Sequence, residues 1–281
     1  MPAFLTRRTW LARAAAAPTA LALPAWAQPT RWTMSIVPQF APAKLHRDWT
    51  PVLERIEANT GIQLVLKLAP TIPRFESDVL GGEVDFAYLN PYHQVMAHRS
   101  LGFVPLVRDS QLLSGILVVR RDDPIRSLGE LDGKTLAFPA PNAFGASLWM
   151  RALLAEREKV RIQPQYVQTH SNVYRQVATG RAAAGGGIRH TLALERHEVR
   201  DELRVLFETP GAAPHPVSAH PRVPAAVRRA VAEALIGLSR DASGQALLKE
   251  VQLAAPVVAD QARDYAPLER YQLERYVVGP A

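Results

Sequence analysis

Polar and aromatic residues gather at three places where a predicted strand gives way to a predicted helix. The three junctions are residues 88–92 (YLNPY), 139–147 (PAPNAFGAS) and 169–172 (THSN). Each places side-chain hydrogen-bonding groups beside the backbone N–H groups that begin a helix, where about half a positive charge resides. Such helix ends bind oxyanions. Three of them meeting in one cleft would hold a tetrahedral anion without a metal ion.

These junctions predict a binding site that has no catalytic residue, no metal ion and no cofactor. The candidate ligand-binding residues are Tyr88, Asn90, Tyr92, Asn142, Ala143, Phe144, Gly145, Ser147, Thr169, His170, Ser171 and Tyr174. A purely structural role is the alternative for several of them. Asn142, Thr169 and Ser171 are good helix N-caps, and a buried tyrosine often only finds a hydrogen-bond partner. The equivalent position of all three junctions favours the binding interpretation.

Short apolar strands alternate with amphipathic helical segments along the rest of the chain, which is typical of an α/β fold with mostly parallel sheets. Strands are expected at residues 32–37, 62–68, 84–89, 112–119, 134–138 and 203–207. Thr50-Pro51 is expected to open the first helix and Gly61 to close it. Residues 210–224 read as a Pro/His-rich connector, followed by one helical region over 225–248 and a tail from 265 to 278.

The alternation starts again after residue 115, which predicts two α/β lobes. Lobe 1 is expected to comprise residues 31–115 and 213–281, and lobe 2 residues 116–212. The chain would then cross between the lobes twice and form a hinge. Ligands of such sheets bind where strand ends meet helix starts, so the cleft between the lobes is the expected site.

The first 27 residues have the layout of a bacterial export signal. The twin arginine Arg7-Arg8 precedes an Ala/Leu-rich stretch, and Ala25-Trp26-Ala27 resembles a cleavage site. The sequence therefore predicts cleavage after Ala27 and a periplasmic location, and the arginine pair favours the twin-arginine route. A single membrane anchor is the alternative, but the apolar stretch is short and Pro18 and Pro24 interrupt it.

Composition excludes several classes of protein. The chain has no cysteine, which excludes disulfides, cysteine zinc sites and a cysteine nucleophile. The net charge is +7, or about +4 without the arginines of the first 27 residues, and the basic residues are scattered, so no nucleic acid is expected as a partner. Neither a Gly-x-Ser-x-Gly elbow nor a His-Glu-x-x-His helix occurs, which argues against an enzyme.

In the order and spacing of its motifs, the mature chain resembles the phosphate, phosphite and phosphonate periplasmic binding proteins of ABC transporters. The resemblance runs through residues 82–92 (GEVDFAYLNPY), 117–120 (LVVR), 127–138 (SLGELDGKTLAF), 169–173 (THSNV) and 178–180 (ATG). It implies a two-lobe clamshell with two hinge crossings, which closes on a small anion and delivers it to a membrane permease as a monomer.

The chain departs from the family pattern at two places. Members commonly carry a hydroxyl-rich loop after the Ala-Phe strand, whereas this loop retains Asn142 and Ser147. Members also commonly carry an Asp shortly after the last glycine motif, where this chain has residues 182–187 (AAAGGG). An aminoalkyl phosphonate is therefore not the expected ligand, and the alternatives to phosphate itself are a different small anion or a partly apolar anion. A sensor module for a receptor kinase and a periplasmic hydrolase are the alternative functions.

Overall fold

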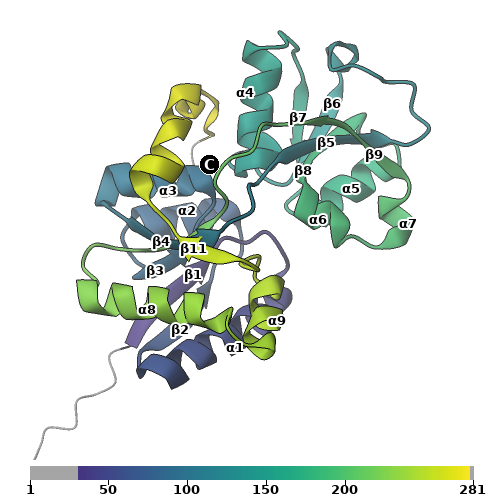
Figure 1. The fold of residues 1–281 in the computed structure, drawn as a ribbon. Coiled ribbons are helices and arrows are strands. Elements are labelled where there is room, and N and C mark those ends of the chain that lie inside the picture. The colour runs from purple at the N-terminus through teal and green to yellow at the C-terminus, as the bar shows by residue number, and fades with distance from the viewer. Residues whose placement is uncertain (1–30, 279–281) are drawn as a thin grey trace, which may run out of the picture.

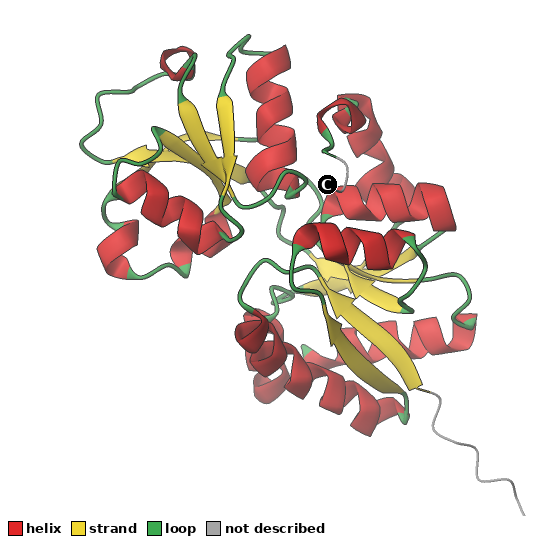
Figure 2. Cartoon of the chain, turned by 180° about the vertical axis from the view of Figure 1, so that it is seen from behind, coloured by secondary structure: helices red, strands yellow, loops and turns green. Residues whose placement is uncertain are grey.

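The computed structural model describes residues 31–278 of the chain, in which two α/β lobes are joined by two crossings (Figure 1). The predicted export signal at residues 1–27 lies outside the described residues. The first sheet has six strands in the order β11-β4-β10-β3-β1-β2, and the second has five in the order β7-β6-β8-β5-β9. Figure 2 shows helices covering the strands of each sheet, so the two-lobe α/β prediction is confirmed.

Lobe 1 contains the first sheet and the helices that cover it. Its strands are β1 (Arg31–Ile36), β2 (Gln63–Leu68), β3 (Phe86–Tyr88), β4 (Val104–Asp109), β10 (Pro216–Ala219) and β11 (Pro256–Val258). Its helices are α1 (Pro42–Thr60), α2 (Ile72–Leu80), α3 (Pro91–Leu101), α8 (Ala225–Leu238) and α9 (Ala242–Glu250). Both ends of the described chain therefore contribute to this lobe.

Lobe 2 is built from one continuous part of the chain. Its strands are β5 (Gly115–Arg120), β6 (Thr135–Phe138), β7 (Gln163–Tyr166), β8 (Ala184–Ile188) and β9 (Leu203–Glu208). Its helices are α4 (Trp149–Glu156), α5 (His170–Ala178), α6 (Arg189–Ala193) and α7 (His197–Arg200), with a π-helical turn η2 (Phe144–Leu148) and a 3-10 turn η1 (Gly129–Leu131).

Both sheets are mixed, which corrects the expectation of mostly parallel sheets. In the first sheet β1 pairs parallel with β2 and β3, whereas β3–β10, β10–β4 and β4–β11 are antiparallel. In the second sheet β6 pairs parallel with β7 and β8, whereas β5 is antiparallel to β8 and β9. The hinge explains the antiparallel pairs β4–β10 and β5–β9, because one strand of each pair leaves its lobe through the hinge and the other returns through it.

The two crossings lie side by side and are hydrogen-bonded to each other. Leu113 N–H donates to the Ala212 carbonyl over 2.8 Å, and Ala212 N–H donates back to Leu113 over 3.0 Å. Just beyond them, Gly115 N–H donates to Thr209 Oγ1 over 2.9 Å. This ladder holds the two crossing segments in one register, so they form a single hinge.

The first helix begins earlier than the sequence predicts. Helix α1 starts at Pro42, and Thr50-Pro51 lies in its interior instead of opening it. Pro42 takes the first helical position, where proline costs no hydrogen bond. Pro51 removes one internal hydrogen bond, but the buried face that includes Trp49, Val52 and Ile56 keeps the helix continuous. Gly61 closes the helix in the left-handed conformation, as expected.

Two further expectations are corrected in the C-terminal third. The Pro/His-rich connector contains strand β10, which lies in the middle of the first sheet between β3 and β4. The single helical region expected over 225–248 is two helices, because Asp241 caps a new helix by accepting the Gly244 N–H over 2.8 Å.

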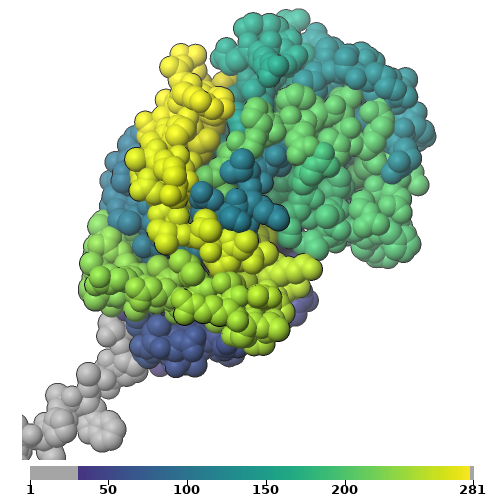
Figure 3. Space-filling model, viewed as in Figure 1, coloured from purple at the N-terminus to yellow at the C-terminus, as the bar shows by residue number. Residues whose placement is uncertain are grey.

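The last described residues form a strap that contacts both lobes. The strap consists of η3 (Gln261–Tyr265), η4 (Ala266–Tyr271), η5 (Leu273–Tyr276) and the residues up to Val278. Tyr265, Leu268 and Leu273 belong to one buried apolar cluster with Tyr92 of α3 and Trp149 of α4. In Figure 3 the strap, coloured yellow, runs along the junction of the lobes. Among residues 31–278, no helix is long and apolar enough to cross a membrane.

Candidate functional site

The strand-to-helix junctions of both lobes converge on a small enclosed space, here called the inner cavity. Lobe 1 lines it with Gln39, Asn90 and His215, and lobe 2 lines it with the turn 143–146 and His170. Its volume is about 20 Å³, which is enough for about one water molecule. No carboxylate and no Lys or Arg is among the lining residues. In this conformation the protein's own side chains therefore fill most of the predicted site.

Helices α3 and α5 direct their N-termini towards this region and are capped by side chains. Asn90 Oδ1 accepts the His93 N–H over 2.7 Å, and Thr169 Oγ1 accepts the Asn172 N–H over 3.2 Å. The structural reading of Thr169 as a cap is thus correct, and Asn90 has the same role. Asn142 is not a cap, because η2 begins after it without a side-chain cap.

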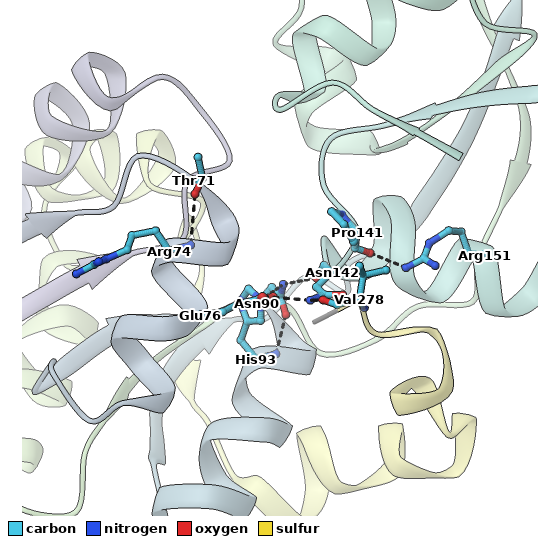
Figure 4. Close-up of polar contacts among 9 residues, drawn as sticks. All are labelled: Thr71, Arg74, Glu76, Asn90, His93, Pro141, Asn142, Arg151 and Val278. Carbon is cyan, nitrogen blue, oxygen red and sulfur yellow. Dashed lines mark hydrogen bonds and ion pairs between the residues drawn. The ribbon is translucent and has the colours of Figure 1, made fainter. Parts of the chain in front are cut away.

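Asn142 instead connects the two lobes through a buried polar network, here called the interlobe bridge (Figure 4). Its Nδ2 donates to Glu76 Oε2 of α2 over 3.1 Å and to the Val278 carbonyl over 3.0 Å. Its Oδ1 accepts the Val278 N–H, and its carbonyl accepts from Asn90 Nδ2, each over 3.1 Å. Glu76 Oε1 lies 2.8 Å from His93 Nε2. The loop of lobe 2 is thereby held to α2, α3 and the strap.

A second set of contacts joins α4 to the strap. Arg151 Nη2 donates to the Tyr276 carbonyl over 2.7 Å and to the Pro141 carbonyl over 2.8 Å. Tyr276 Oη donates to Glu156 Oε1 over 2.7 Å. Burial lowers the pKa of Arg151, which has only neutral acceptors and no carboxylate within bonding distance among the described residues.

Two neutral histidines face the inner cavity. Burial lowers the pKa of His170 to about 4, and burial followed by repulsion from other histidines lowers that of His215 to about 3. His170 Nδ1 lies 3.2 Å from Thr191 Oγ1, and His215 Nε2 lies 2.7 Å from Gln39 Nε2. A neutral imidazole has one N–H donor, so each ring offers the cavity a hydrogen-bonding edge without a net charge.

A much larger space, here called the outer cleft, lies on the other side of His215. Its volume is about 770 Å³, and residues of both lobes line it. Leu113, Ile188 and His215 line both spaces and form the wall between them. Tyr88 stacks on His215 with 5.4 Å between the ring centroids, and it lines the outer cleft.

The structure brings some of the predicted site residues together and separates others. Those lining the inner cavity are Asn90, Ala143, Phe144, Gly145 and His170. Those lining neither space are Tyr92, Asn142, Ser147, Thr169, Ser171 and Tyr174. Tyr92 packs in the buried apolar cluster that it shares with the strap, and burial there raises its pKa to about 12.

Two of the outlying residues have clear structural partners. Tyr174 Oη lies 2.7 Å from Thr191 Oγ1 and 3.3 Å from the Ile188 carbonyl. Ser147 Oγ accepts from Arg151 Nε over 3.3 Å. Both therefore support the elements that carry cavity residues without lining the cavity themselves.

Sequence reasoning missed seven residues of the cavity wall, namely Val37, Gln39, Ile72, Leu113, Ala146, Ile188 and His215. Gln39 follows β1 and Ile188 ends β8, so both stand at further strand-to-helix junctions of the same kind. His215 precedes β10, a strand that the sequence analysis read as a connector. The rule that strand ends build the site would have identified Gln39 after the predicted first strand. It would also have identified Ile188, had β8 been recognised as a strand.

Comparisons with known proteins identify the family. The model of the family described as "ABC transporter, phosphonate, periplasmic substrate-binding protein" matches residues 34–265. No curated protein matches the sequence.

Solved structures share the fold at low sequence identity. A binding protein component of an ABC phosphonate transporter from Pseudomonas aeruginosa aligns with a TM-score of 0.77 at 15% identity, covering 89% of this chain and 88% of that one. PhnD1 from Prochlorococcus marinus, solved with methylphosphonate, aligns with a TM-score of 0.78 at 12% identity, covering 88% and 99%. The family match extends over most of the chain, which therefore belongs to the periplasmic substrate-binding proteins of phosphonate ABC transporters.

Proposed function

We propose that this protein captures a small phosphorus oxyanion between its lobes and delivers it to the permease of an ABC transporter. The observation that carries the proposal is the convergence of the α3 and α5 N-termini on an inner cavity that no carboxylate lines. Helix N-termini and neutral imidazole donors favour an anion, whereas a carboxylate in the wall would repel it.

Binding requires the lobes to separate, because a cavity of about 20 Å³ has no room for a tetrahedral oxyanion. We take residues 31–115 with 213–281, and residues 116–212, as the two bodies that move about the hinge. Separation carries the turn 143–146 and His170 away from Asn90 and His215. A ligand that contacts both sets of residues stabilises a closed form by its differential affinity for that form.

The family match and the export-signal pattern of residues 1–27 support the remaining parts of the proposal. The protein acts in the periplasm after removal of residues 1–27, as a monomer, and leaves the solute chemically unchanged. Methylphosphonate in the Prochlorococcus marinus relative supports a phosphorus oxyanion as the ligand class. The missing hydroxyls around Asn142 argue for fewer direct ligand contacts than in a hydroxyl-rich loop.

A thermal-shift panel tests the function. The purified chain is heated with phosphate, phosphite, methylphosphonate or sulfate, and a ligand at about 100 times its Kd adds about 2.7 kcal/mol to the free energy of unfolding. At least one phosphorus oxyanion is expected to raise the Tm, and His170→Ala to reduce the shift. His197→Ala is the matched control, because His197 is exposed on α7 and lines neither space.

Two results would contradict the proposal. One is a panel in which no phosphorus oxyanion changes the Tm of the wild-type chain at millimolar concentration. The other is an equal shift in wild type and in His170→Ala, which would place the anion somewhere other than the inner cavity.

A further inference from the structure

The outer cleft has the size of a ligand site and is not explained by capture of a small oxyanion. Its volume of about 770 Å³ lies within the range of pockets that hold organic molecules of drug size. Figure 1 places α9 of lobe 1 across from α6 and α7 of lobe 2, and residues of all three line the cleft. Opening of the hinge would alter this space as well as the inner cavity.

The cleft carries an excess of positive charge. Its cationic lining residues are Arg121, Arg189, Arg200, Arg204 and Lys249. The carboxylates in its lining are Asp109 and Asp201. Asp109 is already bound to backbone, because its two oxygens accept the Gln111 and Ala255 N–H groups over 2.7 and 2.9 Å. The lining therefore attracts anions.

Two of these cations are paired with carboxylates, Arg189 with Glu208 and Arg200 with Asp201. The other three, Arg121, Arg204 and Lys249, have no carboxylate partner within 4.0 Å among the described residues. The guanidinium groups of Arg121 and Arg204 bond to backbone carbonyls, which leaves their charge uncompensated. Lys249 is exposed at the end of α9 and has no ion-pair partner over the same residues.

The rest of the wall is suited to an organic body. Apolar side chains contribute to it from both lobes, among them Leu112, Leu192, Ala193 and Val205. Leu112 is 63% exposed beside the hinge, so its side chain is available to contact a ligand in the cleft. His190 Nε2 is buried and has no hydrogen-bond partner among the described residues. Apolar surface, an unused polar atom and surplus positive charge thus occur in the same cleft.

A shared wall separates the cleft from the inner cavity, and His215 is the polar member of this wall beside Leu113 and Ile188. Gln252 Nε2 donates to Gln39 Oε1 over 3.1 Å, and Gln39 Nε2 lies 2.7 Å from His215 Nε2. Gln252 closes the C-terminus of α9 in the left-handed conformation with a φ of 62°, where its N–H donates to the Lys249 carbonyl and the Leu253 N–H to the Leu248 carbonyl, and this end of the helix fixes the position of its side chain. Because His215 lines both spaces, a ligand that reaches from one space into the other has to displace this ring.

We propose that the outer cleft binds the organic body of the ligand, so that the substrate class is an organic phosphonate or phosphate ester with an apolar body and a second negative charge. The proposal rests on the proposed function, which supplies the oxyanion site in the inner cavity. The phosphorus group occupies that cavity, the apolar body passes His215, and the second anionic group lies among the unpaired cations. A free inorganic ion would leave the cleft unused.

Isothermal titration calorimetry with three matched probes tests this substrate class. Methylphosphonate carries the oxyanion alone, phenylphosphonate adds an apolar ring, and 4-carboxyphenylphosphonate adds a second anionic group. We expect phenylphosphonate to bind about tenfold more tightly than methylphosphonate, because its ring buries apolar surface in the cleft. The carboxylated probe is expected to bind more tightly again at low salt and to lose that gain at high salt.

Two pairs of variants locate the effect. Lys249→Glu is expected to weaken binding of 4-carboxyphenylphosphonate about tenfold, whereas Lys134→Glu makes the same charge change at an exposed site that lines neither space. Ala193→Trp fills part of the cleft and is expected to weaken both ring-bearing probes without affecting methylphosphonate. Leu194→Trp is its control, since Leu194 is the next residue, is 56% exposed and does not line the cleft.

The binding results distinguish a failure of the proposed function from a failure of the assignment of the outer cleft. If methylphosphonate and the inorganic phosphorus oxyanions all fail to bind, the proposed function is wrong. If methylphosphonate binds but phenylphosphonate binds no more tightly, or if Lys249→Glu and Lys134→Glu behave alike, the oxyanion site stands and the assignment of the outer cleft is overturned.

Discussion

His170 and His215 show how burial sets the properties of single side chains in this protein. Both are about 5% exposed or less, and each has one polar partner on its ring. Placing a positive charge there would cost far more than in water, because little solvent remains to stabilise it. Both rings are therefore neutral at pH 7, and they face a proposed anion as hydrogen-bond donors without forming ion pairs.

The lowered pKa values predict a loss of stability in acid. An unfolded histidine binds a proton near pH 6.5, whereas folded His170 does so only near pH 4. Between these values the unfolded state binds more protons, so the free energy of unfolding falls as the pH falls from about 6.5 to about 4. Each such group contributes up to about 1.4 kcal/mol per pH unit. Above about pH 6.5 the contribution is constant.

Urea unfolding of wild type and His170→Asn between pH 7.5 and 4.5 measures this effect. The variant is expected to show a shallower loss of unfolding free energy below pH 6.5, because one of the two buried rings no longer titrates. His197→Asn, at an exposed position of α7, is expected to follow the wild-type curve. Parallel curves for wild type and His170→Asn would show that burial does not shift this group.

At the scale of elements, strand β8 depends on its three consecutive glycines. A Cβ on Gly185 would overlap the side chains of Val173 and Val177, and one on Gly187 would overlap the Tyr174 hydroxyl. A Cβ on Gly186 would collide with the Ala146 carbonyl, which is backbone and has no side-chain freedom to move away. The glycine run therefore lets α5 and η2, the elements that carry cavity residues, pack directly against the strand.

Gly186→Ala is consequently expected to destabilise the fold by about 1–3 kcal/mol or more, as overpacking of a core does. Gly237→Ala is the control, because nothing lies within 4 Å of a Cβ at that position of α8, and alanine is the better helix former. Urea unfolding compares the two. A Gly186→Ala protein with the midpoint of the wild type would mean that β8 and η2 are less closely packed than described.

The same glycines explain why part of the fold was not predictable from the sequence. Strands β1, β2, β6 and β9 have apolar or β-branched patterns and were located correctly to within a few residues. Strand β8 reads AGGGI, which lacks the side chains that normally indicate a strand, and its buried position depends on neighbours distant in the sequence. Without it, Ile188 could not be recognised as part of the cavity wall.

The lining of the inner cavity was also predicted only in part, because some of its contacts depend on residues that are distant in the sequence. Local rules identified the helix starts, so Asn90 and His170 were placed at the cavity. They did not show that Asn142 turns away to join Glu76 and Val278, because those partners lie 66 and 136 residues away. Local sequence specifies a cap, but only the packing of the lobes decides which polar group contacts which.

At the scale of the whole molecule, the contacts between the lobes are unevenly distributed. The strap and the interlobe bridge hold α2, α3 and the loop before η2 together through hydrogen bonds and a buried apolar cluster. The outer cleft separates α9 from α6 and α7 on the other side of His215. The lobes must part to admit a ligand, and the same contacts then help to close them over it, so they reduce the free energy that the ligand must supply for closure.

Weakening the bridge is therefore expected to open the molecule. The double variant Asn142→Ala, Arg151→Ala removes side-chain hydrogen bonds to Glu76, Val278 and Tyr276, each of which contributes about 0.5–1.5 kcal/mol. Its radius of gyration in small-angle X-ray scattering is expected to exceed that of the wild type without ligand, and methylphosphonate to bind more weakly.

Arg157→Ala provides the comparison, because Arg157 is exposed beyond the end of α4 and, among residues 31–278, its ion-pair partner is Glu158 of the same lobe. That variant is expected to scatter like the wild type. Saturating ligand should return the double variant towards the compact form, since contacts to both lobes favour closure whether or not the bridge is present. An unchanged radius together with unchanged affinity would show that the bridge only fixes the strap, and that the hinge ladder at Leu113 and Ala212 alone sets the position of the lobes.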